Sequence, residues 1–247
     1  MKKKSFFVFS IVLSLIFIGL NAQATVIDDS TYGSDTYWGG RVVNSSPTQY
    51  GDVIGYPEFS LNGLTGTLSG NIMTVVITGD YFKRQGLAAS MGPGDLYIDK
   101  NGWSVSGTGP HYYDDIFSSA EGWDYVIHLD PDTLTGKIYN INFSDITKTS
   151  AASGYVYRED QAWMGGYGDP VPGNVTGSID SSSITYIFDV TNLGLGSEIG
   201  FHWTMQCGND IIEGNDPLQV QVPEPGTIML IGTGLVGLAG TLLLRKK

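Results

Sequence analysis

The most restrictive feature of the sequence is an uncharged apolar run, Thr227–Leu244, close to the C-terminus. As an α-helix, its eighteen residues would measure about 27 Å, close to the roughly 30 Å hydrocarbon core of a bilayer. The run therefore predicts a transmembrane helix that begins near Thr227, because Pro225 cannot continue a helix. The positive-inside rule places the basic residues 245–247 in the cytoplasm. A buried helix of a soluble domain is the alternative, and the flanking proline and basic residues argue against it.

This tail has three parts in a fixed order: a Pro-Glu-Pro motif, the apolar run and a basic stop. The motif is Pro223, Glu224 and Pro225, and the basic stop is Arg245, Lys246 and Lys247. In this order at the end of the chain, the three parts resemble a PEP-CTERM sorting signal. The resemblance implies that an exosortase, a membrane-embedded transpeptidase-like enzyme, recognises and cleaves the tail. It also implies a bacterial host that makes extracellular polysaccharide.

The N-terminus has the pattern of a secretory signal peptide. Three lysines at residues 2–4 precede an apolar stretch, Phe6–Leu20, and the small residues Ala22 and Ala24 follow it in an A-x-A pattern. We therefore predict export through the Sec translocon and cleavage by signal peptidase after Ala24. An uncleaved anchor is the alternative, but the apolar stretch is short and ends in this cleavage pattern.

These two signals define the expected domain organisation. We predict a signal peptide at 1–24, an exported domain at 25–215, a linker at 216–222 and the sorting signal with its transmembrane helix at 223–247. The chain has 13 basic and 25 acidic residues; without three lysines at the front, three cations at the back and Glu224, 7 basic and 24 acidic residues remain. A body charge of about −17 excludes nucleic acid as a partner.

Cys207 is the only cysteine of the chain. An intramolecular disulfide is therefore impossible, although an exported protein could form one. A single cysteine near the end of an apolar strand is typical of a small buried hydrophobic side chain. We expect Cys207 to lie in the core rather than to act as a nucleophile.

The body alternates short β-branched runs with turns rich in Gly, Asn, Asp and Ser, which predicts an all-β antiparallel β-sandwich of jelly-roll type. The clearest strand is 72–78, and Gly70-Asn71 predicts a hairpin with the segment 64–68. The other predicted strands are 95–98, 123–129, 137–143, 183–190 and 199–205. In the strand 199–205, we expect Phe201, Trp203 and Met205 on one face and His202 and Thr204 on the other.

No catalytic motif is visible in the sequence. The three histidines, His111, His128 and His202, are not at a zinc-ligand spacing, and no G-x-S-x-G elbow occurs. We interpret His128 and His202 as strand-surface or hydrogen-bonded core residues. A hydrolase would require the acids Glu121 and Asp124 to meet these histidines in one cleft.

Two weaker patterns concern ligands. Asp95, Asp99 and Asn101 offer oxygen atoms of the kind that calcium prefers, although no EF-hand pattern is present. The aromatic residues Tyr112, Tyr113, Trp163 and Tyr167 are expected in loops, where their rings could stack on sugars. Alternatively, the acids only form turns and the rings only pack against the edge of the sandwich.

The sequence therefore predicts a non-enzymatic exported protein of the bacterial surface or extracellular matrix. No cofactor is required by this hypothesis. The alternative is a calcium-assisted, lectin-like module that binds exopolysaccharide. In both cases the tail holds the protein in the inner membrane until an exosortase cleaves it.

Overall fold

The computed structural model describes residues 26–28, 41–42, 59–84, 92–108, 114–150, 158–208 and 210–217. All of these residues lie in one structural unit, 24–220. The predicted signal peptide, including Ala22 and Ala24, and the predicted transmembrane helix lie outside the described residues. Within these ranges, no helix is long and apolar enough to cross a membrane.

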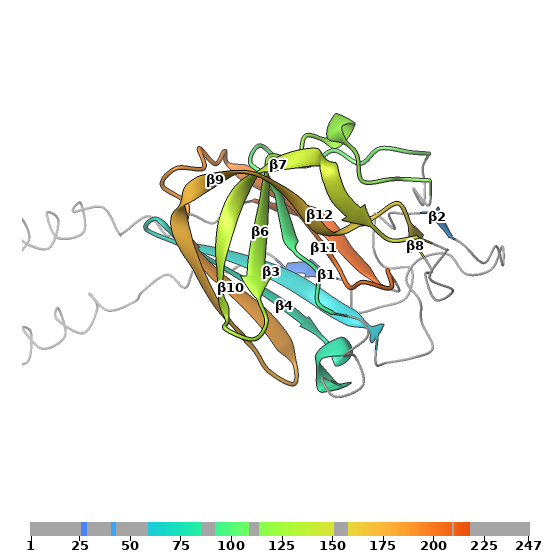
Figure 1. The fold of residues 1–247 in the computed structure, drawn as a ribbon, viewed down its shortest axis with the longest axis horizontal. Coiled ribbons are helices and arrows are strands. Elements are labelled where there is room, and N and C mark those ends of the chain that lie inside the picture. Colours follow the sequence, from blue (N-terminus) through green and yellow to red (C-terminus); the bar gives the residue numbers. More distant parts are fainter. Residues whose placement is uncertain are drawn as a thin grey trace, which may run out of the picture. The chain divides into compact units, whose positions relative to one another are not determined.

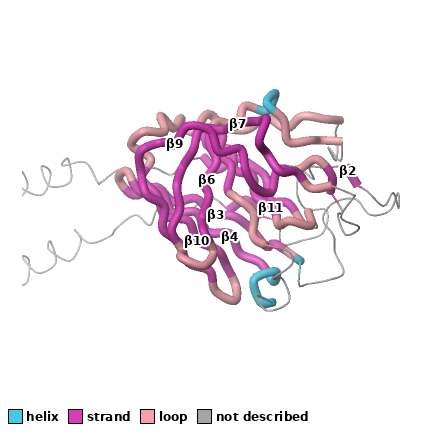
Figure 2. Tube along the Cα trace, in the orientation of Figure 1, coloured by secondary structure: helices cyan, strands magenta, loops and turns pink. Residues whose placement is uncertain are grey.

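Strands make up most of the described chain (Figure 2). The strands are β1 (Val26–Asp28), β2 (Arg41–Val42), β3 (Leu61–Ser69), β4 (Ile72–Gly79), β5 (Leu96–Asp99), β6 (Tyr125–Asp130), β7 (Thr135–Lys148), β8 (Arg158–Glu159), β9 (Ala162–Ile179), β10 (Ser183–Asp189), β11 (Glu198–Thr204) and β12 (Ile211–Pro217). Two short 3₁₀ helices, η3 (Asp80–Arg84) and η5 (Ser119–Glu121), lie between strands.

Ten strands form one antiparallel sheet in the order β1-β3-β4-β10-β9-β7-β6-β5-β11-β12 (Figure 1). β2 and β8 form a separate two-stranded pair. The predicted all-β antiparallel class is confirmed, but the ladder is one continuous sheet instead of two stacked sheets of jelly-roll type. The long strands β7 and β9, of 14 and 18 residues, explain the difference. Several β-bulges interrupt their pairing and bend them, so the sheet curls around its own core.

The predicted hairpin of β3 and β4 is confirmed. Ser69 pairs with Ile72, and Gly70 has a left-handed φ of 59°, which glycine adopts without steric cost. The strands predicted around residues 95–98, 123–129, 137–143, 183–190 and 199–205 are also present, as β5, β6, β7, β10 and β11. The β propensity of the residues and the alternation of apolar and polar side chains therefore predicted most strands of the sheet.

Strand β9 is the main element that the sequence analysis did not predict. It is rich in residue types that weaken or interrupt a strand, among them Gly166, Gly168, Pro170 and Pro172, and no strand was predicted there. Trp163 and Tyr167 were expected in loops and were wrongly placed, because both lie in β9. The bulges opposite β7 explain how a strand can contain so many glycines and prolines.

Strand β12 also differs from the expectation. It continues through Asp216 and Pro217, the first two residues of the predicted linker. Asp216 is buried, so the folded body reaches at least Pro217. A proline is tolerated there because β12 is an edge strand.

The two edges of the sheet come together through side chains. β12 lies beside β1 and β3, giving a nearly barrel-shaped arrangement. The backbone N–H of Leu61 donates to Asp210 Oδ2 at 2.5 Å, and that of Gly66 donates to Asp216 Oδ2 at 2.9 Å. Both carboxyl groups are buried. At this junction, two aspartate side chains therefore accept the hydrogen bonds that backbone carbonyl groups accept between the other strands.

We predict that Asp216→Ala lowers the free energy of unfolding by about 2 kcal/mol, because it leaves the N–H of Gly66 buried without an acceptor. Burial raises the pKa of Asp216 to about 6, so this residue is largely protonated at pH 5. At that pH Asp216→Asn, which keeps an acceptor oxygen, should unfold like the wild type. Urea unfolding followed by tryptophan fluorescence measures both variants. Equal losses for Ala and Asn would show that the hydrogen bond is not the stabilising contact.

Two hydrophobic clusters stabilise the sheet, one on each face. The inner cluster contains Trp203, Tyr186 and Phe201, and it also contains Cys207, as expected. The outer cluster covers part of the opposite face and contains Tyr97, Trp103, Phe117, Trp123, Val126 and Ala162. Residues 103–108 and 114–123 supply three of these aromatic rings, and we call these two stretches together the covering segment. Both faces of β11 are consequently buried, since the covering segment shields the face that bears His202.

Candidate functional site

The first polar group lies on the outer face, where β5, β6 and β9 meet. Asp95 precedes β5, and its buried carboxylate accepts hydrogen bonds from the Tyr167 hydroxyl at 2.7 Å and from the Gly165 N–H at 2.9 Å. His128 Nδ1 lies 2.8 Å from the other Asp95 oxygen. The structure thus joins Asp95 and Tyr167, which the sequence analysis assigned to different ligands, at one site with His128.

The hydrogen-bond partners fix the state of the His128 ring. A carboxylate can only accept, so Nδ1 carries the hydrogen and donates to Asp95. This bond is the main cause that raises the pKa of His128, against the opposing effect of burial. The His128 side chain is 34% exposed. A surface-facing imidazole is therefore held in one orientation by a buried acid.

Two tyrosines extend this site across the sheet. The centroid of the Tyr167 ring lies 5.3 Å from that of His128 and 5.0 Å from that of Tyr139. Both tyrosines are half-buried at the border of the outer cluster. We call His128, Tyr139 and Tyr167 the ring group. The exposed Lys137 is the cross-strand partner of His128, so its side chain leaves the sheet on the same face.

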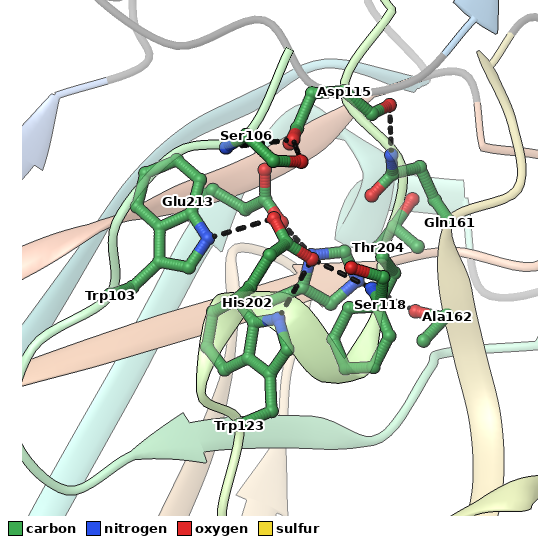
Figure 3. A network of polar contacts seen from close by, with 12 residues as sticks. Trp103, Ser106, Asp115, Ser118, Trp123, Gln161, Ala162, His202, Thr204 and Glu213 are labelled. Atoms are coloured by element: carbon green, nitrogen blue, oxygen red, sulfur yellow. Dashed lines mark hydrogen bonds and ion pairs between the residues drawn. The ribbon is translucent and has the colours of Figure 1, made fainter.

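The second polar group is buried beneath the covering segment (Figure 3). Glu121 lies at its centre and accepts from three donors: Trp103 Nε1 at 3.1 Å, Trp123 Nε1 at 3.2 Å and the Ser118 N–H at 2.7 Å. Ser118 and Glu121 form a capping box around η5, which ends at Gly122 with a φ of 96°. One carboxyl group thus fixes both tryptophans of the covering segment.

The same buried group contains a histidine–acid pair, His202 and Glu213 (Figure 3). His202 Nε2 lies 2.7 Å from the Ala162 carbonyl, which only accepts, so Nε2 carries the hydrogen. His202 Nδ1 lies 2.5 Å from Glu213 Oε1. Burial lowers the pKa of His202 to about 4, and burial followed by Asp115 raises that of Glu213 well above its usual range. His202 is therefore neutral near pH 6. Because its hydrogen is on Nε2, Nδ1 accepts, and the Glu213 carboxyl group is the donor of this contact.

Asp115 completes this buried group (Figure 3). Its carboxylate accepts from the backbone N–H of Ser106 at 3.1 Å and from the Ser106 hydroxyl, and its carbonyl accepts from Gln161 Nε2 at 3.0 Å. Burial raises the pKa of Asp115. Burial, then Glu213 and Asp115, raises the pKa of Glu121 to about 8. Asp115, Glu121 and Glu213 are all buried, and burial is the first cause that raises the pKa of each acid.

The predicted calcium ligands do not form one group. Asp99 Oδ1 accepts from the N–H of Asn101 at 2.8 Å in a turn, whereas Asp95 binds His128 and Tyr167. Within the described ranges, no three His, Cys, Asp or Glu side chains are arranged to hold a metal ion. Calcium binding stays a prediction, without support from these side chains.

The other predicted residues are distributed as follows. Trp163 is half-buried in β9, outside the ring group. Tyr112 and Tyr113 lie outside the described residues, as do Pro223, Glu224, Pro225, Arg245, Lys246 and Lys247. The four residues that a hydrolase would need do not meet in one cleft. Glu121 and His202 are buried together, Asp124 pairs with Lys100 at 2.7 Å, and His128 pairs with Asp95.

The sequence analysis missed the buried group and the role of Tyr139. One signal for the buried group was present: Ser118 followed by Glu121 is a capping-box spacing. Nothing in the sequence connected these residues to Glu213, almost a hundred positions later. The pairing of β6 with β7 and of β7 with β9 brings Tyr139 to the ring group, and that pairing could not be predicted from the chain alone.

Comparison with known proteins identifies the tail. Residues 221–247 match the PEP-CTERM protein-sorting motif. The comparisons with curated proteins and with solved structures give no match. The motif confirms the sorting signal expected from the sequence, and it implies an exported protein that is anchored transiently in the membrane and processed by an exosortase. The matched residues are about a tenth of the chain, so the motif describes the route of the protein and leaves the activity of its body open.

Proposed function

We propose that this chain is a non-enzymatic protein of the bacterial surface or extracellular matrix. The sorting motif at residues 221–247 carries this proposal, because it is an address for surface delivery. The body is consistent with a structural role. The acids of the buried group are engaged in holding the covering segment on the sheet, and Asp210 and Asp216 join the edges of the sheet.

The route follows from the two end signals. The Sec translocon exports the chain, and signal peptidase removes residues 1–24. The apolar run then holds the protein in the inner membrane, and the exosortase cleaves near residues 223–225. The exported body remains at the surface or in the surrounding exopolysaccharide of a biofilm.

The mature C-terminus tests the sorting route. We predict that mass spectrometry of the surface form finds an end near residues 223–225 and no peptide containing 245–247. Deleting the exosortase, or changing Glu224 to Ala, should leave the tail intact. Gln221→Ala, at the edge of the matched motif, is the control and should be processed normally. An intact tail on the wild-type surface form would contradict the proposal.

Calcium-assisted binding of exopolysaccharide is a second candidate function. The observation that favours sugar binding is the ring group on the outer face of the sheet. Pull-down with the host exopolysaccharide, with and without EDTA, tests this function. Binding that EDTA abolishes would support the calcium-assisted form, and binding that EDTA leaves unchanged would support sugar binding alone. No binding in either condition would remove the candidate.

A further inference from the structure

The ring group has the rigidity of a binding site. The Asp95 carboxylate receives three hydrogen bonds, from His128 Nδ1, the Tyr167 hydroxyl and the Gly165 N–H. Burying a carboxylate is costly even when it is paired, and an apolar residue would pack here at a lower cost. In return, the hydrogen bonds of this carboxylate fix the positions of the His128 and Tyr167 side chains. Fixed rings lose little conformational entropy when a ligand binds.

The charges at the ring group differ from those of the domain as a whole. His128 and Lys137 are cross-strand partners, and both carry a positive charge when His128 is protonated. The Asp95 charge lies beneath them, compensated by its three donors. Asp130 lies two residues from His128 on the same face of β6, and its charge helps to raise the pKa of His128. Its carboxylate accepts from the N–H groups of Asp132 at 2.8 Å and Thr133 at 3.1 Å in the β6–β7 turn. His128 and Lys137 therefore place two cationic donors side by side on this face, in a body with 24 acidic and 7 basic residues.

We propose that the ring group and Lys137 form a binding site for a sugar unit that carries a carboxylate, such as a uronate within a polysaccharide. The apolar face of the sugar ring would lie against Tyr139 and Tyr167. The sugar carboxylate would accept hydrogen bonds from His128 Nε2 and Lys137 Nζ, which are charge-assisted and therefore strong. This inference rests on carbohydrate binding, the second candidate function, and is independent of the sorting route.

Isothermal titration of the purified full-length chain tests the site with two defined probes. The first probe is tetragalacturonate, and the second is its fully methyl-esterified form, which has the same rings without the charge. We expect the wild type to bind the acidic probe at least tenfold more tightly than the ester. Equal affinity for the two probes would overturn the assignment of an acidic sugar.

Three variants locate the binding. His128→Gln and Lys137→Gln should each weaken binding of tetragalacturonate about tenfold, and Tyr139→Ala should weaken both probes. Lys83→Gln is the matched control. Lys83 is an exposed lysine on η3, outside the ring group, and its ammonium group pairs with Asp80. Melting temperatures confirm that each variant is folded.

The possible results distinguish a failure of the proposed site from a failure of carbohydrate binding as a whole. Variants that bind tetragalacturonate or the host exopolysaccharide like the wild type would overturn this site while carbohydrate binding stands. A wild type that binds neither the probes nor the exopolysaccharide would overturn both. A loss confined to the three variants, with Lys83→Gln unchanged, would establish the site.

Discussion

The protein should be most stable near pH 5 and should lose stability as the pH rises to 9. The main cause is Glu121, whose pKa is about 8 in the folded state and about 4.3 in an unfolded chain. Between these two values the folded state keeps a proton that the unfolded state has released. Stability therefore falls with increasing pH across this window, by about 1.4 kcal/mol for each pH unit. Glu121 alone accounts for a loss of up to about 4 kcal/mol between pH 5 and pH 8.

The other buried titratable groups also change the pH dependence of stability, and the direction follows from the pKa shift of each group. Glu213, Asp115 and Asp216 also have raised pKa values, so they add to the loss at high pH. His202 acts in the opposite sense. Its folded pKa is about 4, below the unfolded value of about 6.5, so its contribution is lost as the pH falls from 6.5 to 4. The sum gives a maximum in mildly acidic solution.

Thermal melts from pH 4 to pH 9 measure this dependence. We expect the melting temperature to fall by about 10 °C between pH 5 and pH 8. Glu121→Gln is the control, because glutamine does not ionise. It should melt lower than the wild type at pH 5, since its amide group cannot satisfy all three donors, but its melting temperature should change less with pH. A wild type that is equally stable at pH 5 and pH 8 would contradict this account.

The second large effect is expected for Gly200→Ala. Gly200 lies in the middle of β11, and a methyl group at its Cα would overlap the backbone of Trp103, whose nitrogen would be 2.6 Å away. Trp103 cannot move freely, because its N–H donates to Asn215 Oδ1 at 2.7 Å and its carbonyl accepts from Asn215 Nδ2 at 2.8 Å. The substitution should therefore displace the covering segment and break the bond between Trp103 and Glu121.

We expect Gly200→Ala to lower the free energy of unfolding by about 3 kcal/mol, from overpacking and the lost hydrogen bond. Chemical unfolding measures this loss, and a red shift of tryptophan emission should report the exposure of Trp103. Gly92→Ala is the matched control, because a methyl group there meets nothing within 4 Å. If the two variants unfold alike, the contact between β11 and the covering segment is not important for stability.

Local signals in the sequence explain what could be predicted of the fold. The strand face of Ile184, Tyr186 and Phe188 is buried and the opposite face is more exposed, as alternation predicts. The β3–β4 hairpin followed from Gly70 and Asn71, because turn chemistry depends on adjacent residues. β9 was missed since its glycines and prolines are tolerated only through bulges against β7.

The candidate sites depend on contacts between distant residues. Asp95 and Tyr167 were both recognised as candidates, but each was given a different ligand. Their hydrogen bond joins residues 72 positions apart, and the path of the sheet alone brings them together. His202 was expected on a strand surface or as a hydrogen-bonded core residue. It is a core residue, because the covering segment buries its side chain.

The sequence by itself determined the route of this protein and its fold class. The tail is read as a linear motif, and the strands arise from local propensity and alternation, so neither depends on long-range contacts. Only the tertiary structure decided that the strands form one curled sheet, that Asp210 and Asp216 join its edges, and that Glu121 anchors the covering segment. The physical reason is that burial and pairing of polar groups change their pKa values and their roles. These changes arise when the chain brings distant residues together in the absence of water.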